Sequence, residues 1–407
     1  MRQLLFLSIL ILLPFLLPAQ TPDGKWTLEE CIRHALEHNI NLKQREQEEE
    51  NRKISLHTSK HRWLPNLNAG VSQNFDFGRS PSNDGTIVDR TSANSSMYLQ
   101  LNMPVFDGME ISNDIAAKKL DLLAATESLN KAREDLAINV ASYYLQVLYN
   151  KEMQVIAELQ AALSQEQVKR TESLVQAGKV PLSQLYDMKA QAAADEVSLT
   201  EANNNVSLAL LDLAQSLELE RNDKGFDIEN PVTGDALTQY MGSILLPDLI
   251  YDEAVAFKPQ IKEQEYLLES QKKQLNVARA GYYPKLNLSA SYSNGYYHYY
   301  NEKDYINPAF NTQWRQNERK TVGLSLSIPI FNRFQVRNSV RSARVAISTR
   351  ELMRDDARKV LYKEIQQAYY NATAAQEKYI SSGKSVEAGK EAFTYAEERY
   401  NAGKSTV

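Results

Sequence analysis

Two pairs of histidines have the residue type and spacing that could bind a metal ion. His34 and His38 are four residues apart, as are His57 and His61, so each pair lies on one face of a helix. No third ligand is apparent near either pair, and histidines exposed on a helix surface account for both. We therefore expect no metal centre.

The last residues resemble a phosphate-binding loop. The run Ala402-Gly403-Lys404-Ser405-Thr406 places a lysine and a hydroxyl after a glycine, but the position five residues before Gly403, where the motif opens with glycine, is Glu398. A helix rather than a strand is expected before it. No nucleophile, base and orienting group can be assembled elsewhere, so the sequence predicts neither an enzyme nor a cofactor.

The element that dominates the chain is a very long helix. Residues 110–177 contain no proline or glycine and are rich in Ala, Leu, Glu, Lys and Gln, which favour helix. Such a helix would be roughly 100 Å long and must lie along other helices. Gly178 ends it, and Pro181 begins a return helix over 182–217. An apolar seam recurs every seven residues, at Ile115, Leu122, Leu129, Leu136 and Tyr143.

Composition limits the partners and the compartment. The 407 residues carry a net charge of -5 without a dense basic block, so nucleic acid is not an expected partner. Cys31 is the single cysteine, which excludes an internal disulfide. Residues 1–20 are typical of a secretory signal peptide, with Arg2 before an apolar run. That run is too short to cross a membrane as a helix, so we expect membrane entry through strands.

Four segments alternate between apolar and polar residues, as amphipathic strands do. They cover about 67–77, 96–103, 286–296 and 321–330. A polar loop is expected over 78–91. Helices are expected before the first and third segments, over 31–63 and 249–282. One face of the strands is predicted to contact lipid through Leu67, Ala69, Val71, Leu99, Leu101, Leu286, Leu288, Leu324 and Leu326.

The chain contains an internal duplication. Leu64-Pro65-Asn66-Leu67 is echoed by Tyr283-Pro284-Lys285-Leu286 at an offset of 219, and Pro104-Val105-Phe106 by Pro329-Ile330-Phe331 at an offset of 225. We expect a first repeat over 21–217, a connector over 218–247 and a second repeat over 248–407. The second repeat lacks a return helix, and we expect the gene product to be longer than the sequence given.

Four strands cannot close a barrel, and an open sheet edge is not tolerated in lipid. Two copies would give eight strands, and three would give twelve strands with room for a lumen. Polar residues on the second face, such as Asn66, Asn68 and Ser289, favour a wet lumen. The cluster Tyr296, Tyr297, Tyr299 and Tyr300 is explained either by an aromatic girdle at the membrane interface or by packing within a surface loop.

In its ordered motifs the chain resembles the TolC family of outer-membrane efflux proteins. The resemblance covers essentially the whole mature chain. The matching segments are Trp26 to Cys31 with Ala35, Leu36 and Asn39, Leu64 to Leu67, Pro104 to Gly108, Tyr143-Tyr144, Val175 to Pro181, Tyr283 to Leu286, Ile328 to Phe331 and Tyr400 to Lys404.

The resemblance implies a fold that is mainly α with a small β part. Long helices would form a coiled-coil α-barrel across the periplasm, and a homotrimer would form a 12-stranded barrel in the outer membrane of a Gram-negative bacterium. It also implies a periplasmic adaptor protein joined to an inner-membrane pump. The adaptor would contact two tip turns, formed by Ala177, Gly178, Lys179, Val180, Pro181 and by Ala402, Gly403, Lys404, Ser405.

In the family an acidic ring gates the tunnel six and nine residues after the second tip glycine. Those positions fall beyond Val407, and their equivalents after Gly178 are Gln184 and Asp187, of which one is acidic. The predicted function is a passive exit duct of an efflux or type I secretion system. The alternative is a periplasmic coiled-coil scaffold whose strands form a soluble sheet without a pore.

Overall fold

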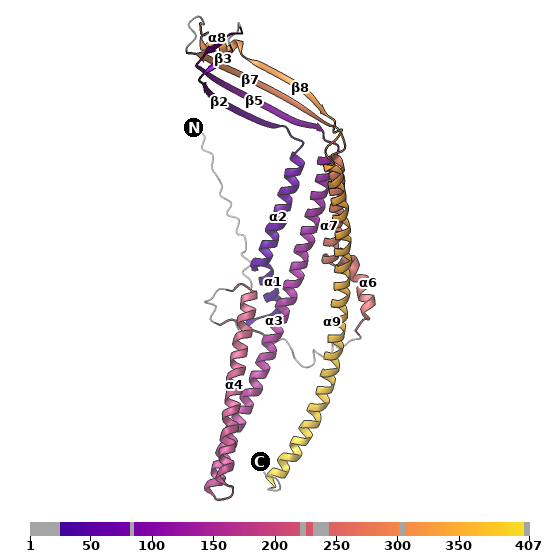
Figure 1. Cartoon of the computed structure of the whole chain (residues 1–407). Coiled ribbons are helices and arrows are strands. Elements are labelled where there is room, and N and C mark those ends of the chain that lie inside the picture. The colour runs from indigo at the N-terminus through magenta and orange to yellow at the C-terminus, as the bar shows by residue number, and fades with distance from the viewer. Residues whose placement is uncertain (1–24, 82–84, 220–224, 231–243, 301–305, 403–407) are drawn as a thin grey trace, which may run out of the picture. The chain divides into compact units, whose positions relative to one another are not determined.

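The computed structural model describes residues 25–81, 85–219, 225–230, 244–300 and 306–402 (Figure 1). Its elements are β1 Lys25–Trp26, α1 Leu28–His38, α2 Ile40–His61, β2 Asn66–Asp76, β3 Arg79–Pro81, β4 Ile87–Asp89, β5 Ser92–Phe106, α3 Glu110–Gln176, α4 Leu182–Ser216, β6 Asp227–Ile228, α6 Pro247–Phe257, α7 Pro259–Ala280, β7 Lys285–Tyr299, α8 Phe310–Gln316, β8 Arg319–Ser327 and α9 Gln335–Asn401. The predicted signal peptide and the tip residues Gly403, Lys404 and Ser405 lie outside the described residues.

The duplication is visible in the bounds of the elements. Adding 219 to the bounds of α1 and α2 gives those of α6 and α7, and adding 225 to those of α3 gives those of α9. The helices α3 and α9 each contain 67 residues. Of the two compact units, the one formed by 45–131 and 243–407 nevertheless takes residues from both halves, whereas the one formed by 1–44 and 132–242 takes them from the first half and the connector. The repeat boundaries therefore stay a prediction.

The helices expected over 31–63 and 249–282 are each divided in two, which corrects both expectations. Asn39 and Lys258 occupy equivalent positions and leave the helical conformation with nearly the same backbone angles. The side chain of Asn39 caps α2 by accepting a hydrogen bond from the Leu42 N–H at 3.1 Å. In the second half Pro259, as the first residue of α7, takes the place of that cap.

The long helix and its return helix lie as predicted, but part of the predicted seam is wrong. Leu129 is buried, whereas Tyr143 is 41% exposed and its neighbour Tyr144 is 1% exposed. The buried face therefore passes through Val140, Tyr144 and Val147, one residue away from the heptad expected there. None of the described helices is both long enough and apolar enough to cross a bilayer.

Four strands form one antiparallel sheet in the order β2-β5-β7-β8 (Figure 1). The central pairing, β5 with β7, joins the hairpin of the first half to that of the second. The expected polar loop instead contains a small hairpin, because β3 pairs with β4. The last strand ends at Ser327, two residues before Pro329, which has no N–H for a ladder hydrogen bond.

Each unit has a core of its own. In the first unit Cys31, Val140 and Leu213 are fully buried in one cluster, which Ile228 of the connector also joins. In the second unit Ile261 packs with Ala254 and Leu361, where α6 and α7 meet α9. The connector is therefore not wholly irregular, since β6 pairs in parallel with β1 and contributes to the first core.

Candidate membrane sheet and tip turn

Strand register places the nine residues predicted to contact lipid on one face of the sheet. Across the strands, Leu67 is paired with Leu101, and Leu288 is paired with both Met103 and Leu324. Directly paired residues point to the same side of a sheet, so the apolar residues of all four strands share a face. Val71 is 83% exposed and Leu324 is 68% exposed. The apolar residues of the edge strands β2 and β8 are exposed, while Leu101, Leu286 and Leu288 in the central strands are half-buried. Together they form one apolar surface.

The opposite face of the sheet is polar. It carries Asn66, Asn68 and Ser72 on β2, and Ser289, Ser291 and Ser293 on β7. Ser72 and Ser96 are directly opposite each other, and their hydroxyl oxygens are 2.7 Å apart in a hydrogen bond. The sheet therefore separates two environments, one apolar and one able to hydrogen-bond water.

The apolar face ends at polar residues toward the hairpin connections. On β7 and β8 the next pair after Ala290 and Val322 is Tyr292 with Lys320, and Lys320 forms an ion pair with Glu318 at 2.7 Å. A tyrosine and a lysine suit the border between hydrocarbon and water, because each has an apolar body and a polar tip.

The tyrosine cluster lies beside α8, at the outer end of β7. Strand β8 pairs with β7 only as far as Ser293, and side-chain amides complete the edge beyond it. Gln313 accepts from the Tyr297 N–H at 3.0 Å and donates to the Tyr297 carbonyl at 2.8 Å. Asn307 holds Tyr299 in the same way, at 2.8 and 2.7 Å. This edge closure could not be predicted from sequence, because glutamine and asparagine in a loop carry no signal of it.

The passage from the sheet into α3 is held by a capped turn. Asp107 is buried, and its carboxylate accepts from the Ile111 N–H at 2.6 Å. Gly108 has a φ of +71°, and a Cβ there would lie 2.8 Å from the Ala280 carbonyl oxygen. Glycine is therefore required at this position by conformation and by close approach.

An ion network joins α2, α3 and β7 at this turn. Glu110 pairs with Arg62 at 2.8 Å and with Lys285 at 2.7 Å, while Arg62 also reaches Asp114 at 3.3 Å. Burial acts to raise the pKa of Glu110, but the hydrogen bonds and charges of Lys285 and Arg62 outweigh it, and the pKa lies below its usual value. The network ties the base of the sheet to the helices.

The tip between α3 and α4 is a compact turn with an exposed glycine. Gly178 has a φ of +68° and donates to Val175, while Lys179 donates to Leu174, both at 2.9 Å. This double pattern is a Schellman motif, which satisfies carbonyls at the helix end. A Cβ on Gly178 would meet nothing within 4 Å. The predicted tip residues Ala177, Gly178, Lys179 and Pro181 are exposed, and Val180 is half-buried.

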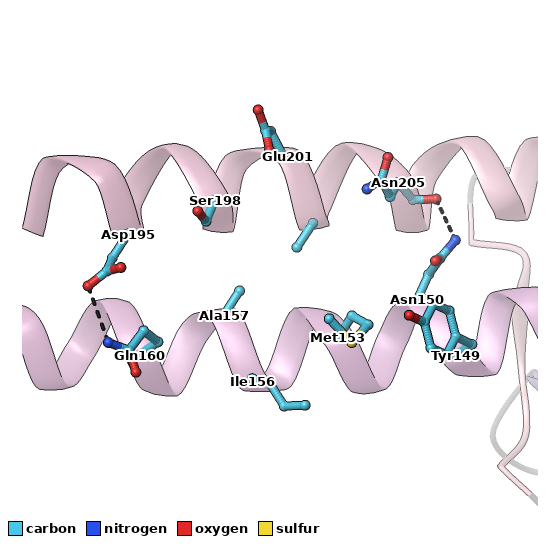
Figure 2. Close-up of a pocket in the computed structure, with 11 residues that line it drawn as sticks. Tyr149, Asn150, Met153, Ile156, Ala157, Gln160, Asp195, Ser198, Glu201 and Asn205 are labelled. Atoms are coloured by element: carbon cyan, nitrogen blue, oxygen red, sulfur yellow. Dashed lines mark hydrogen bonds between the residues drawn. The ribbon is translucent and has the colours of Figure 1, made fainter. Parts of the chain in front are cut away.

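Helices α3 and α4 enclose a hollow of about 400 Å³ above the tip turn along their length (Figure 2). Gln160 of α3 donates to Asp195 of α4 at 3.4 Å, and Asn150 donates to the Asn205 carbonyl at 3.2 Å. The hydroxyl of Ser198 donates to its own helix, at the Ala194 carbonyl. The polar groups of the hollow hold the two helices together and do not form a nucleophile and base.

The two histidine pairs and the residues Gln184 and Asp187 do not form a common site. The rings of His34 and His38 are stacked with centroids 4.1 Å apart, and those of His57 and His61 are 6.2 Å apart. Within the described ranges no group of three or more His, Cys, Asp or Glu residues could hold a metal ion. Gln184 is half-buried and Asp187 is exposed on α4, close to the tip.

A sheet that is apolar on one face and polar on the other, joined to helices of 67 residues, is typical of an outer-membrane channel protein. The model of the outer membrane efflux protein family matches residues 31–218 and 250–407. The chain belongs to this family. It is an exit channel of an efflux or secretion system, with a large helical part in the periplasm.

Two relatives agree with this assignment. The chain is 26% identical over 371 residues to the pyoverdine export outer membrane protein OpmQ of Pseudomonas aeruginosa, covering 84% of this chain and 69% of OpmQ. It is 21% identical over 338 residues to the proteases secretion protein PrtF of Dickeya chrysanthemi, covering 81% and 69%.

The fold is that of solved channels. A structure of CusC superposes with a TM-score of 0.77 at 17% identity, covering 93% of this chain and 83% of CusC. The outer membrane protein VceC of Vibrio cholerae gives a TM-score of 0.74 at 16% identity, covering 93% and 87%. The mainly helical fold with a small sheet is thereby confirmed.

Proposed function

We propose that three copies of this chain close their four-stranded sheets into one twelve-stranded barrel with a wet lumen. The observation that carries this proposal is the register, which gives all four strands an apolar face and a polar face. Among the described strands of one chain, β2 and β8 are the two edges of the sheet, each paired on one side only. Edges in lipid must be paired, so neighbouring copies would join β8 to β2.

Native mass spectrometry of the protein extracted from outer membranes in detergent tests the copy number. The expected result is a trimer. A monomer would instead support the scaffold without a pore. So would protein that is found only in the salt-soluble periplasmic fraction, without detergent. The exposed apolar face of the sheet favours the channel, because a soluble scaffold would leave that face in water.

We also propose that the channel is a passive conduit, energised by an inner-membrane pump through a periplasmic adaptor. The family and the export functions named for OpmQ and PrtF support this role. In the proposal the adaptor contacts the tip turns at Ala177 to Pro181 and Ala402 to Ser405. The exposed Schellman turn supports the first of these, because a partner can approach the Gly178 backbone closely.

Two substitutions at Gly178 separate bulk from backbone strain. Both Gly178→Trp and Gly178→Ala place a Cβ at a φ of +68°, which costs roughly 1–2 kcal/mol in either variant. Only tryptophan adds bulk to the surface. We predict that Gly178→Trp lowers export while Gly178→Ala exports nearly as well as wild type, with trimers intact in both. Export is measured as accumulation of a fluorescent pump substrate in cells, and equal export by the two variants would remove Gly178 from the contact.

A further inference from the structure

The ring of Tyr98 covers Gly70 and occupies the space that a side chain at position 70 would fill. The two residues are directly opposite each other on β5 and β2, on the polar face of the sheet. A Cβ on Gly70 would lie 2.6 Å from both Cε1 and Cζ of Tyr98 and 2.8 Å from its hydroxyl oxygen. Such distances are not tolerated, so the ring occupies the volume that any larger residue at position 70 would need.

The surroundings of this ring are small and polar. Tyr98 is flanked on β5 by Ser96 and Gln100, and its direct partner on β7 is Ser293. Tyr98 is 47% exposed and lies on the face that the proposed barrel turns toward its lumen. A tyrosine standing upright here would project well beyond its neighbours, whereas one lying on glycine follows the surface of the sheet.

The second hairpin provides an internal comparison. The offsets of 219 and 225 place Ser289 at the position of Gly70 and Gly323 at that of Tyr98, and these two residues are also directly paired. A Cβ on Gly323 would lie 3.6 Å from the Ser289 hydroxyl oxygen, an ordinary contact. The equivalent place in the second hairpin is therefore open and carries no ring.

We propose that the absence of a side chain at Gly70 lets the ring of Tyr98 lie flat against the sheet, and that the position of this ring sets the width of the channel at this level. The proposal rests on the trimeric barrel proposed above, in which three such rings would surround the lumen. A side chain at position 70 displaces the ring, because its Cβ would occupy the place of Cε1 and Cζ. The ring then leaves the sheet surface and narrows the passage for solutes, which makes Tyr98 a residue that determines size selection.

Trimers in planar lipid bilayers test the proposal by conductance and by entry of polyethylene glycols of graded size. The polymer is added on the side of the loops that join β2 to β5 and β7 to β8. Gly70→Ala is expected to lower conductance and to exclude polymers that enter the wild-type channel. Gly323→Ala is the matched control and should equal wild type. Gly70→Ala combined with Tyr98→Ala should restore both readouts.

The outcomes separate this inference from the proposed barrel. Wild-type trimers that neither conduct nor admit any polymer would overturn the barrel itself. A conducting wild type with an unchanged Gly70→Ala variant would leave the barrel standing and overturn the role of Tyr98. Where Gly70→Ala does not assemble, Tyr98→Ala at an unchanged Gly70 decides, since removal of the ring must admit larger polymers than wild type and equal access would overturn the proposal.

Discussion

Cys31 is a buried probe of the core of the first unit. It is 0% exposed, and burial raises the pKa of its thiol to about 12, so little thiolate forms near neutral pH. In the same cluster the single hydroxyl proton of Tyr144 is shared between two carbonyl oxygens, that of Glu229 at 2.5 Å and that of Trp26 at 3.2 Å. These bonds hold the strands β1 and β6 against α3.

We predict that the Tyr144→Phe substitution increases the fraction of molecules in which this core is locally open. The substitution keeps the ring but removes the hydrogen bonds, which costs about 1–2 kcal/mol and corresponds to roughly 5- to 30-fold more open protein. The measurement is the alkylation rate of Cys31 under native conditions, which should rise by that factor. Tyr143→Phe, at the adjacent exposed position, is the control and should leave the rate unchanged. Equal rates for the two variants would contradict the prediction.

Glu110 gives the junction below the sheet a defined acid sensitivity. Its pKa is lowered in the folded protein, so its stabilising contribution is complete above the unfolded value of 4.5 and is lost as the pH falls through the folded pKa. We predict that Glu110→Gln lowers the melting temperature at neutral pH and weakens its decline below about pH 4.5.

Thermal unfolding followed by circular dichroism between acidic and neutral pH measures this effect. Glu48→Gln is a suitable control, because Glu48 forms an exposed pair with Arg52 four residues along the same helix. A Glu110→Gln variant with the same pH dependence as wild type would show that the network with Arg62 and Lys285 does not contribute.

Among the elements, β8 offers the sharpest test of the two faces. Leu324 lies on the apolar face, and Ser325, the next residue, lies on the polar face. We predict that Leu324→Arg costs about 2–4 kcal/mol in the membrane, whereas Ser325→Arg costs little. The measurement is the amount of trimer recovered from outer membranes. Similar recovery of the two variants would contradict the assignment of the apolar face to lipid.

Sequence patterns predicted the elements whose signal is local or periodic. The helix over 110–176 and the strand faces follow from the absence of proline and glycine and from alternation. The break at Asn39 has no strong local signal, because asparagine is tolerated inside a helix. The break at Lys258 does have one, because Pro259 disfavours the helical conformation of the residue before it, and the expected helix over 249–282 did not take it into account. The seam at Tyr143 was misplaced by one residue, since a straight helix drifts relative to a strict seven-residue repeat.

Features that depend on distant residues could not be predicted. The pairing of Gly70 with Tyr98 requires the register of two strands, and the closure of the β7 edge by Gln313 requires the fold of a loop. The small hairpin of β3 and β4 was missed because its strands have three residues each, too few for a periodic signal.

At the scale of the whole molecule, the compact units do not follow the duplicated halves. The parallel pairing of Lys25 and Trp26 with Asp227 and Ile228 brings the connector into the first unit. The similarity between the repeats therefore indicates that the chain arose by duplication, but it does not predict which segments pack into one compact unit.

The equal lengths of α3 and α9 indicate which changes the chain accepted after the duplication. The offset between the halves rises from 219 to 225 within the hairpins, so the net insertion lies there, in the half that carries α8. The long helices differ in residues but have kept their number of residues. One added residue would rotate the rest of a helix by about 100° and advance it by about 1.5 Å, turning its buried stripe away from its neighbours. Divergence has therefore altered side chains and loops while the helix lengths were inherited unchanged.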